Sequence, residues 1–389
     1  MNRFSDKILL VISAFLTIAG LWLVFSASST LGLLKNNDLA SYFNHQMVLV
    51  FLAVLPFAVG LLVPYKFYRK TSVFMMLFVL LLLIIVLFSE EKKGATRWLN
   101  IGPFGIQPAE LAKIVLILHL ARLSVRFGSK IQNMKKLLLP LGWIGLFMFL
   151  VILQPNFSTA LIIGTLGFVM IYVGGAKFKH LVGIALLIGV FIVVRMWQTD
   201  YSHKRLVGWL GANGTETVSA PSRQVEEALI GLGSGGLEGV GLGKSQQANL
   251  FLPEAYGDFI FAILGEETGF VGTMMISTLY IIFFLMALLT LNHIEDDYGK
   301  LIVFGLSFNI VLSAIINIAV VLGIFPTTGI PLPFISYGGS SLWVFVFSVG
   351  VILNVTAKGE IWHNVRNSFL KGFSGTVKFF EKMFDGIEI

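Results

Sequence analysis

The sequence predicts an all-α, polytopic membrane protein with about ten transmembrane helices, both termini in the cytoplasm and one large extracytoplasmic loop. Three observations predict this fold class. Hydrophobic residues make up 56% of the 389 residues against 13% charged residues, and the mean hydropathy is +0.85. Apolar runs of roughly 20 residues, the length that crosses a bilayer, recur along the chain. Lysine and arginine gather in alternate loops between those runs, as the positive-inside rule describes.

Ten apolar runs are expected to cross the membrane. They start near Ile8, Met47, Ser72, Pro108, Leu137, Ser158, His180, Asp258, Leu301 and Phe334. Most of the 28 lysine and arginine residues fall in one of the two alternating sets of loops, and that set is cytoplasmic because basic residues resist translocation. An even number of spans places both termini on that side. The net charge of +7 therefore reflects topology, and nucleic acid is not expected as a partner.

The whole chain, residues 1–389, is expected to form a single transmembrane domain. Its large extracytoplasmic loop covers residues 196–257, and a loop of that length is typically functional or disordered. After the last span, residues 358–389 carry phenylalanines at helical spacing among lysines, which predicts an amphipathic tail on the cytoplasmic leaflet. The chain has no cysteine, so disulfides, thiolate metal sites and thiol nucleophiles are excluded.

One candidate site precedes the fourth span. Residues 94–113 place Arg97 at the outer surface and then start a helix at Pro108, with Glu110 and Lys113 one turn apart on one face. Charges inside a membrane are costly unless they are partnered, so both are functional candidates. A structural ion pair that anchors this helix is an equally weighted alternative.

A second candidate site lies where the large loop ends. Glycine-rich residues 233–244, which end in Lys244, offer backbone amides that an approaching phosphate can reach, and a tightly turning connection is the alternative. Asp258 follows at the start of the eighth span, where a carboxylate can contact water and lipid headgroups. Glu266 lies about 80° from it around a helix, so the two carboxylates can share one cavity. For Asp258 alone, the alternative is an aspartate favoured by the helix dipole.

A third candidate is the segment 326–341, which combines three prolines with a helix start that carries Ser336 and Ser340. Broken backbone at membrane depth either lines a cavity or is buried in protein. Close helix packing through small residues is the alternative. The six histidines show no paired metal-ligand spacing, so no metal site is predicted from them.

These motifs resemble those of the SEDS family (shape, elongation, division and sporulation), which includes FtsW, RodA and SpoVE, over nearly the whole chain. The stretches that carry the resemblance are 95–99 (ATRWL), 107–113 (QPAELAK), 154–157 (QPNF), 233–237 (GSGGL), 252–255 (LPEA), 258–261 (DFIF), 265–267 (GEE) and 331–341 (PLPFISYGGSS). The resemblance implies ten spans with both ends inside. It also implies a peptidoglycan glycosyltransferase that polymerises lipid II at the outer face of the bacterial cytoplasmic membrane.

Within this family, residues 239–245 followed by 252–255 are more similar to the division member FtsW, or to SpoVE, than to the elongation member RodA. The resemblance therefore implies septal cell-wall synthesis, with a class B penicillin-binding transpeptidase of the FtsI type and divisome regulatory membrane proteins as partners. Three positions depart from the family pattern. Tyr256 and Gly257 stand where the family usually has histidine and threonine or asparagine, and Asn156 stands where it has aspartate. Asp258 is retained.

The implied reaction is attack of a sugar 4-hydroxyl on an anomeric carbon while undecaprenyl pyrophosphate departs, an inverting transfer that forms a β-1,4 bond. Asp258 is expected to accept the proton of the hydroxyl. Arg97, Lys113 and Lys244 are candidates to offset the pyrophosphate charge, and Mg²⁺ or Mn²⁺ can share that task, although no ligand set for a metal is recognisable. The remaining candidates for substrate binding are Glu110, Glu266, Ser336 and Ser340. Two alternatives stay open: a lipid II flippase, and a non-catalytic scaffold for a transpeptidase.

Overall fold

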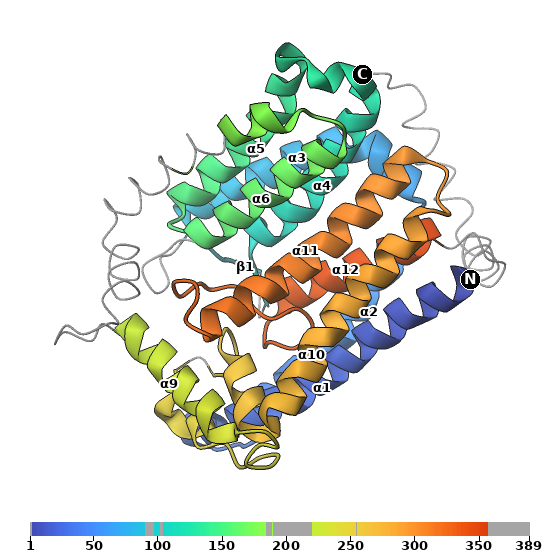
Figure 1. Cartoon of the computed structure of the whole chain (residues 1–389). Coiled ribbons are helices and arrows are strands. Elements are labelled where there is room, and N and C mark those ends of the chain that lie inside the picture. Colours follow the sequence, from blue (N-terminus) through green and yellow to red (C-terminus); the bar gives the residue numbers. More distant parts are fainter. Residues whose placement is uncertain are drawn as a thin grey trace.

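The computed structural model describes residues 2–89, 97–101, 104–183, 189, 220–253 and 255–356, and these are almost entirely helical (Figure 1). The α-helices are α1 (Asn2–Asn36), α2 (Ser41–Leu62), α3 (Tyr65–Ile85), α4 (Pro108–Phe127), α5 (Met134–Leu153), α6 (Phe157–Val173), α9 (Ala220–Gly235), α10 (Ile260–Leu291), α11 (Asp297–Val321) and α12 (Gly339–Thr356). Short elements are the 3₁₀ helices η1 (Val86–Phe88) and η2 (Gly128–Gln132), the π-helix η3 (Gln247–Phe251), and the strands β1 (Leu99–Ile101) and β2 (Phe104–Ile106).

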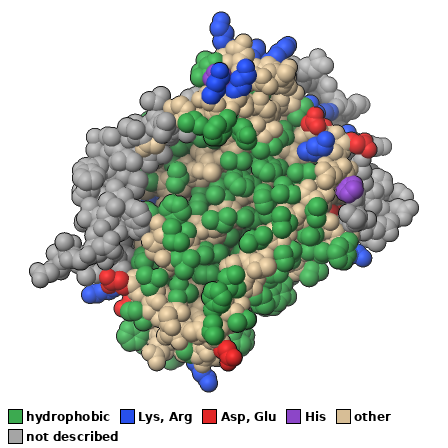
Figure 2. All heavy atoms as spheres, in the orientation of Figure 1, with side chains coloured by type: hydrophobic (Ala, Val, Ile, Leu, Met, Phe, Trp, Pro, Cys, Tyr) green, Lys and Arg blue, Asp and Glu red, His purple; other side chains and the backbone are tan. Residues whose placement is uncertain are grey.

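Seven helices of the described part are long and apolar enough to cross a membrane, which confirms the prediction of an all-α, polytopic membrane protein. They are α1, α2, α3 with η1, α5, α10, α11 and α12. The face shown in Figure 2 carries a broad band of hydrophobic side chains, with lysine and arginine gathered towards its upper edge. Such a band is what a bilayer requires of the residues that it surrounds.

Helix α4 differs from these seven because it carries charged residues and yet lies inside the bundle. It packs against α3, α6 and α11, and nearly all of its residues from Pro108 to Ser124 are buried. Neighbouring helices shield its polar side chains from lipid, so α4 does not need the apolar surface of a peripheral span.

Helices α2 and α12 approach each other unusually closely at a pair of glycines. A Cβ on Gly60 would lie 2.5 Å from the carbonyl oxygen of Phe347, and a Cβ on Gly350 would lie 2.5 Å from that of Phe57. Any larger residue at either position would push the helices apart, because membrane helices associate through small residues that let backbones meet.

Several predicted elements differ from the structure or fall outside it. The seventh predicted span, from His180, lies almost wholly outside the described residues, as do residues 196–219 of the large loop and the tail 358–389. The last span begins at Gly339, not near Phe334. Prolines within residues 322–338 disfavour a helix there, because proline cannot donate a backbone hydrogen bond and restricts the residue before it. We call residues 322–338 the proline segment.

A small antiparallel hairpin that was not predicted precedes α4. Strand β1 pairs with β2 in the register Leu99 to Ile106 and Ile101 to Phe104. Ser340 at the start of α12 donates a 2.8 Å hydrogen bond to the carbonyl of Gly105 and accepts one of 3.1 Å from the amide of Gln107. The hairpin and the first turn of α4 are thereby fixed to α12.

Candidate active site

Asp258 lies in the turn that leads into α10, and its side chain is half-buried. The Asp258 carbonyl accepts a 2.7 Å hydrogen bond from the side-chain amide of Asn317 on α11, and the same amide donates a 2.8 Å bond to the carbonyl of Ile330. Asn317 is 1% exposed. One buried amide therefore fastens the Asp258 turn to α11 and to the proline segment.

Arg97 approaches the same place from the chain that enters the hairpin. Its guanidinium donates to the carbonyls of Gln154, at 3.4 Å, and Pro155, which lie between α5 and α6. A Cβ placed on Gly329 would lie 3.6 Å from Oδ2 of Asp258 and 4.0 Å from Nη1 of Arg97. Gly329 is itself exposed. The Asp258 carboxylate and the Arg97 guanidinium thus both lie next to one exposed glycine.

Two buried polar atoms of the surrounding residues have no hydrogen-bond partner within the described part of the chain. They are Oδ1 of Asn317 and Oγ1 of Thr328, which is the neighbour of Gly329. Buried polar atoms are normally satisfied, by water or ligand where protein does not reach them. Bound water is therefore expected to satisfy these two atoms.

Both predicted serines are engaged with backbone groups. Ser336 donates a 2.8 Å hydrogen bond to the carbonyl of Gly257 and accepts one of 2.8 Å from the amide of Leu332. The amide of Tyr337 donates a 3.0 Å bond to the carbonyl of Tyr256. Ser340, as described above, fixes the hairpin. The two hydroxyls thus position the segments that carry Asp258 and Arg97, and residues 332–336 of the proline segment are broken backbone buried against protein.

The predicted pair Glu110 and Lys113 forms an ion pair of 2.8 Å, with side chains only 5% and 1% exposed. The Lys113 ammonium also lies 5.7 Å from the centre of the Phe345 ring on α12. This burial leaves Lys113 almost no surface for direct contact with a pyrophosphate. The geometry favours the structural alternative for the pair.

Glu266 is 2% exposed and, among the described residues, its carboxylate accepts hydrogen bonds only from residues 245–247 at the start of η3. Its donors are the Ser245 hydroxyl and the amides of Gln246 and Gln247, the amides at 3.0 and 3.2 Å. Both carboxylate oxygens are thereby occupied in holding the loop. The expected cavity shared with Asp258 finds no support in these contacts.

The glycine-rich stretch packs against α10 and does not leave its amides open. The amides of Gly239, Val240 and Gly241 donate to the carbonyls of residues 235, 266 and 267, at 2.7, 2.9 and 3.1 Å. A Cβ on Gly239 would lie 2.2 Å from the Glu267 carbonyl oxygen. These glycines serve close packing, as the alternative to a phosphate cradle describes. Lys244 is exposed nearby.

The same stretch supplies a cap within α10. Gly269 has a positive φ of 65°, which breaks the helix into two. Immediately after it, the amide of Phe270 donates a 2.9 Å bond to the Gly236 carbonyl, and that of Val271 a 3.2 Å bond to the Leu237 carbonyl. The second part of α10 therefore takes its first acceptors from the extracytoplasmic loop.

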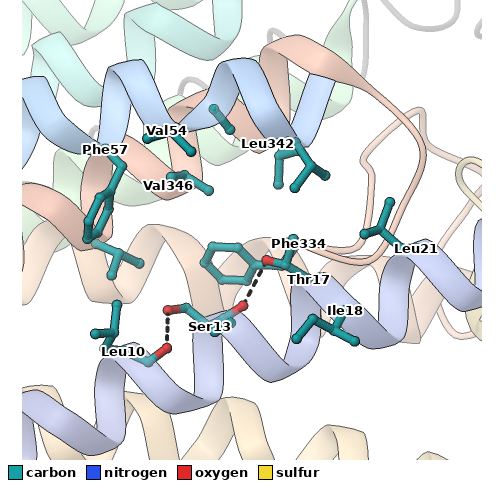
Figure 3. A pocket seen from close by; sticks show the side chains of 14 residues that line it. Leu10, Ser13, Thr17, Ile18, Leu21, Val54, Phe57, Phe334, Leu342 and Val346 are labelled. Atoms are coloured by element: carbon teal, nitrogen blue, oxygen red, sulfur yellow. Dashed lines mark hydrogen bonds between the residues drawn. The ribbon is translucent and has the colours of Figure 1, made fainter. Parts of the chain in front are cut away.

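An apolar groove of about 280 Å³ lies between α1, α2 and α12 (Figure 3). Its polar lining groups, the hydroxyls of Ser13 and Thr17, donate to the backbone of α1 at 2.9 and 2.8 Å. Phe334 of the proline segment also lines it. The groove is thus a lipid-compatible surface separate from the polar groups around Gly329.

A family model described as "Cell cycle protein" (FTSW_RODA_SPOVE) matches residues 6–360. The chain belongs to the FtsW/RodA/SpoVE family. It is 32% identical over 357 residues to "Probable peptidoglycan glycosyltransferase FtsW" of Geobacter sp. (strain M18), covering 91% of this chain and 97% of that protein. It is 34% identical over 355 residues to "Stage V sporulation protein E" of Bacillus subtilis (strain 168), covering 90% and 96%.

Solved structures of the FtsW/RodA/SpoVE family share this fold. The rod shape determining protein RodA of Thermus thermophilus matches with a TM-score of 0.66 and 26% identity, over 90% of this chain and 95% of that one. A chain of "Structural coordination of polymerization and crosslinking by a peptidoglycan synthase complex" matches with a TM-score of 0.71 and 24% identity, over 90% and 96%. The resemblance seen in the sequence is confirmed.

The departures from the FtsW/RodA/SpoVE pattern have structural accounts in two cases. Asn156 caps α6, because its side-chain oxygen accepts a 3.4 Å hydrogen bond from the amide of Thr159, which an aspartate can also do. Tyr256 packs against Tyr42 and Tyr337. Nothing in the structure explains Gly257 beyond its carbonyl, which any residue would supply.

Two residues of the site, Asn317 and Gly329, were not predicted from the sequence. Asn317 lies in an apolar span, and a polar residue at such a position was a usable signal. Gly329 could not be recognised from the sequence, because it belongs to the site only through its proximity to Asp258 and Arg97, which are remote in sequence. Among the described residues, no three histidine, aspartate or glutamate side chains gather closely enough to hold a metal ion.

Proposed function

We propose that this protein is a peptidoglycan glycosyltransferase of cell-wall synthesis that polymerises lipid II into β-1,4 glycan strands, with Asp258 as general base. The observation that carries the proposal is the placement of half-buried Asp258 beside Arg97 at exposed Gly329. A carboxylate and a guanidinium next to the same exposed residue suit a reaction that removes a proton and releases an anion.

The proposed step is a single inverting displacement. The 4-hydroxyl of the acceptor sugar attacks the anomeric carbon of the donor, and the bond from that carbon to the pyrophosphate oxygen breaks. Asp258 accepts the hydroxyl proton as the new bond forms. Arg97 offsets the charge that develops on the leaving pyrophosphate. Asn317 holds the Asp258 turn at a fixed distance from the proline segment, which keeps the carboxylate in place.

The family's curated names support this activity. Relatives of 30–32% identity over about nine-tenths of the chain are named peptidoglycan glycosyltransferase FtsW. We extend the proposal to the bacterial cytoplasmic membrane as location and to septal synthesis as role. A class B, FtsI-like penicillin-binding transpeptidase is the proposed partner, because a structural relative comes from a complex described as coordinating polymerization and crosslinking. Divisome regulatory membrane proteins remain a prediction.

A divalent cation also remains a prediction, based on the charge of a pyrophosphate leaving group. Since the described residues supply no three-ligand site, we propose Mg²⁺ or Mn²⁺ held chiefly by the substrate. EDTA is then expected to slow polymerisation without lowering the melting temperature of the protein, and added Mg²⁺ to restore it.

The deciding experiment compares Asp258→Asn with Asp297→Asn in proteoliposomes that contain lipid II. Asp297 is a matched control, because its side chain is 77% exposed and its ion-pair partner is Lys300, at 3.4 Å. Polymerisation is expected to be lost only in Asp258→Asn, with melting temperatures unchanged. Full polymer formation by folded Asp258→Asn would reject the base. Translocation of labelled lipid II without polymer would instead favour a flippase, and complementation of growth by that variant a scaffold.

A further inference from the structure

Three tyrosines from three separate segments meet beside the Asp258 turn. Tyr42 begins α2, Tyr256 precedes α10 and Tyr337 ends the proline segment. Their ring centres lie 5.1 Å apart for Tyr42 and Tyr256, 5.3 Å for Tyr256 and Tyr337, and 5.8 Å for Tyr42 and Tyr337. The ring of His45 lies 5.8 Å from that of Tyr337. We call these four residues the aromatic cluster.

The cluster is fixed to the catalytic turn by backbone hydrogen bonds. The Tyr337 amide donates to the carbonyl of Tyr256, and Ser336 donates to that of Gly257. Tyr256 stands two residues before Asp258, so their Cα atoms are at most about 7 Å apart. The cluster and the proposed base therefore share one short turn of the chain.

The rings differ from the interior tyrosines of this protein. Tyr280 is 2% exposed and Tyr298 is 0% exposed, whereas all three cluster tyrosines are partly exposed and His45 is exposed. Tyrosines are also common where a membrane meets water, which is the simplest alternative reading. An interfacial anchor, however, does not require three rings from remote segments to pack on one another.

The edge of the cluster carries hydrogen-bonding groups. The Tyr337 hydroxyl and Nδ1 of His45 share a hydrogen bond of 2.8 Å. Burial, and next the neighbouring Tyr42, raise the pKa of the Tyr337 phenol above its ordinary value, so the hydroxyl keeps its proton and remains a donor. The cluster thus combines apolar ring surface with polar atoms at its rim.

A pyranose ring presents the complementary chemistry. Its axial C–H groups form an apolar face that packs on aromatic rings, and its hydroxyl and acetamido groups extend from the edge towards hydrogen-bonding partners. We infer that the aromatic cluster is a saccharide subsite, which holds one N-acetylhexosamine ring of the lipid-linked substrate next to Asp258. This inference rests on the proposed function, because it names the part of the substrate that is gripped.

Direct binding tests the subsite without relying on turnover. The probe is a β-1,4-linked tetramer of N-acetylglucosamine, titrated into detergent-solubilised full-length protein and followed by saturation-transfer NMR. Tyr256→Ala and Tyr42→Ala are each expected to weaken binding about 10-fold, since a stacked ring contributes on that order. Tyr256→Phe keeps the ring and is expected to bind within about 2-fold of the unmodified protein.

Tyr172, at the C-terminal end of α6, provides a matched control. Tyr172 is 52% exposed and pairs with Phe178 at 5.7 Å, so Tyr172→Ala also removes an exposed, ring-paired tyrosine, and unchanged binding is expected. Melting temperatures confirm that each variant is folded. No saturable binding by the unmodified protein, or unchanged binding by folded Tyr256→Ala and Tyr42→Ala, overturns the subsite and leaves an interfacial anchor.

Two further measurements separate the outcomes. Asp258→Asn is expected to bind the tetramer normally while losing polymerisation. Unmodified protein that binds the tetramer but forms no polymer from lipid II would refute the polymerase and keep the subsite. In the polymerase assay, a raised KM for lipid II in Tyr256→Ala places the monomeric substrate on the cluster. Shorter glycan products with an unchanged KM place the growing strand there. Both results support the subsite.

Discussion

Two pairs of oppositely charged side chains in this protein differ in their exposure to solvent. Glu110 and Lys113 on α4 are joined at 2.8 Å and sealed in the bundle. Asp258 and Arg97 stand on either side of Gly329, half-buried and next to an exposed position. The first pair meets the cost of charge in a membrane through its own partner, whereas the second lies beside an exposed residue at which a substrate can approach.

The contrast teaches that a charge within a membrane protein is an ambiguous signal until its partners are known. Glu266 makes the same point, because within the described part of the chain its carboxylate accepts hydrogen bonds only from residues 245–247. A charged side chain that is fully buried with an internal partner indicates a structural role, whereas a partly exposed charge beside an oppositely charged side chain is a candidate for catalysis.

The largest effect is expected for Asp258→Asn. Loss of a general base lowers the rate about 10²- to 10⁴-fold, and the melting temperature is expected to stay the same because the Asp258 carbonyl, which Asn317 holds, is unaltered. Rates are measured by polymerisation of labelled lipid II. A rate within 10-fold of that of the unmodified protein would show that Asp258 is not the general base.

Lys113→Ala tests the sealed pair. It leaves the Glu110 carboxylate buried without its partner, which destabilises by about 3–5 kcal/mol. The double variant Glu110→Gln with Lys113→Met is expected to recover most of that loss. Thermal unfolding in detergent measures both. If Lys113→Ala is stable but inactive, the pair belongs to the chemistry after all.

Asn317→Leu tests whether the amide positions the base. Two hydrogen bonds to buried carbonyls are lost, and each unsatisfied group costs about 1–3 kcal/mol. We expect kcat to fall roughly 10-fold while KM for lipid II changes little, because the substrate does not contact this side chain. Equal losses in Asn317→Leu and in Ser307→Ala, an α11 serine bonded only to its own helix, would show a general stability effect.

Gly329→Ala is expected to have the smallest effect. The new methyl group would contact Asp258 Oδ2 at an ordinary 3.6 Å, so folding is unaffected and activity falls only a few-fold. Gly329→Leu fills the opening and is expected to abolish polymerisation while leaving the melting temperature unchanged. Normal activity of Gly329→Leu would show that substrate does not pass between Asp258 and Arg97.

The sequence predicts some features of the site and hides others for physical reasons. The apolar runs predict the helical bundle because bilayer thickness sets their length, and Asp258 is placed at the start of the eighth span within two residues of the observed helix. The sequence does not predict the roles of Glu266, Ser336 and the glycines 235–241, because their hydrogen-bond partners are remote in sequence. Asn317 was not predicted, although it is a polar residue in an apolar span, because the segment 326–341 that follows it was the more conspicuous candidate.

The break at Gly269 gives α10 a particular mechanical character. The helical turns from Ile260 to Thr268 form a short rod of their own, joined to the long membrane rod through a glycine and braced from outside by the carbonyls of Gly236 and Leu237. A displacement of Gly236 and Leu237 is therefore expected to reorient α10, which begins two residues after Asp258.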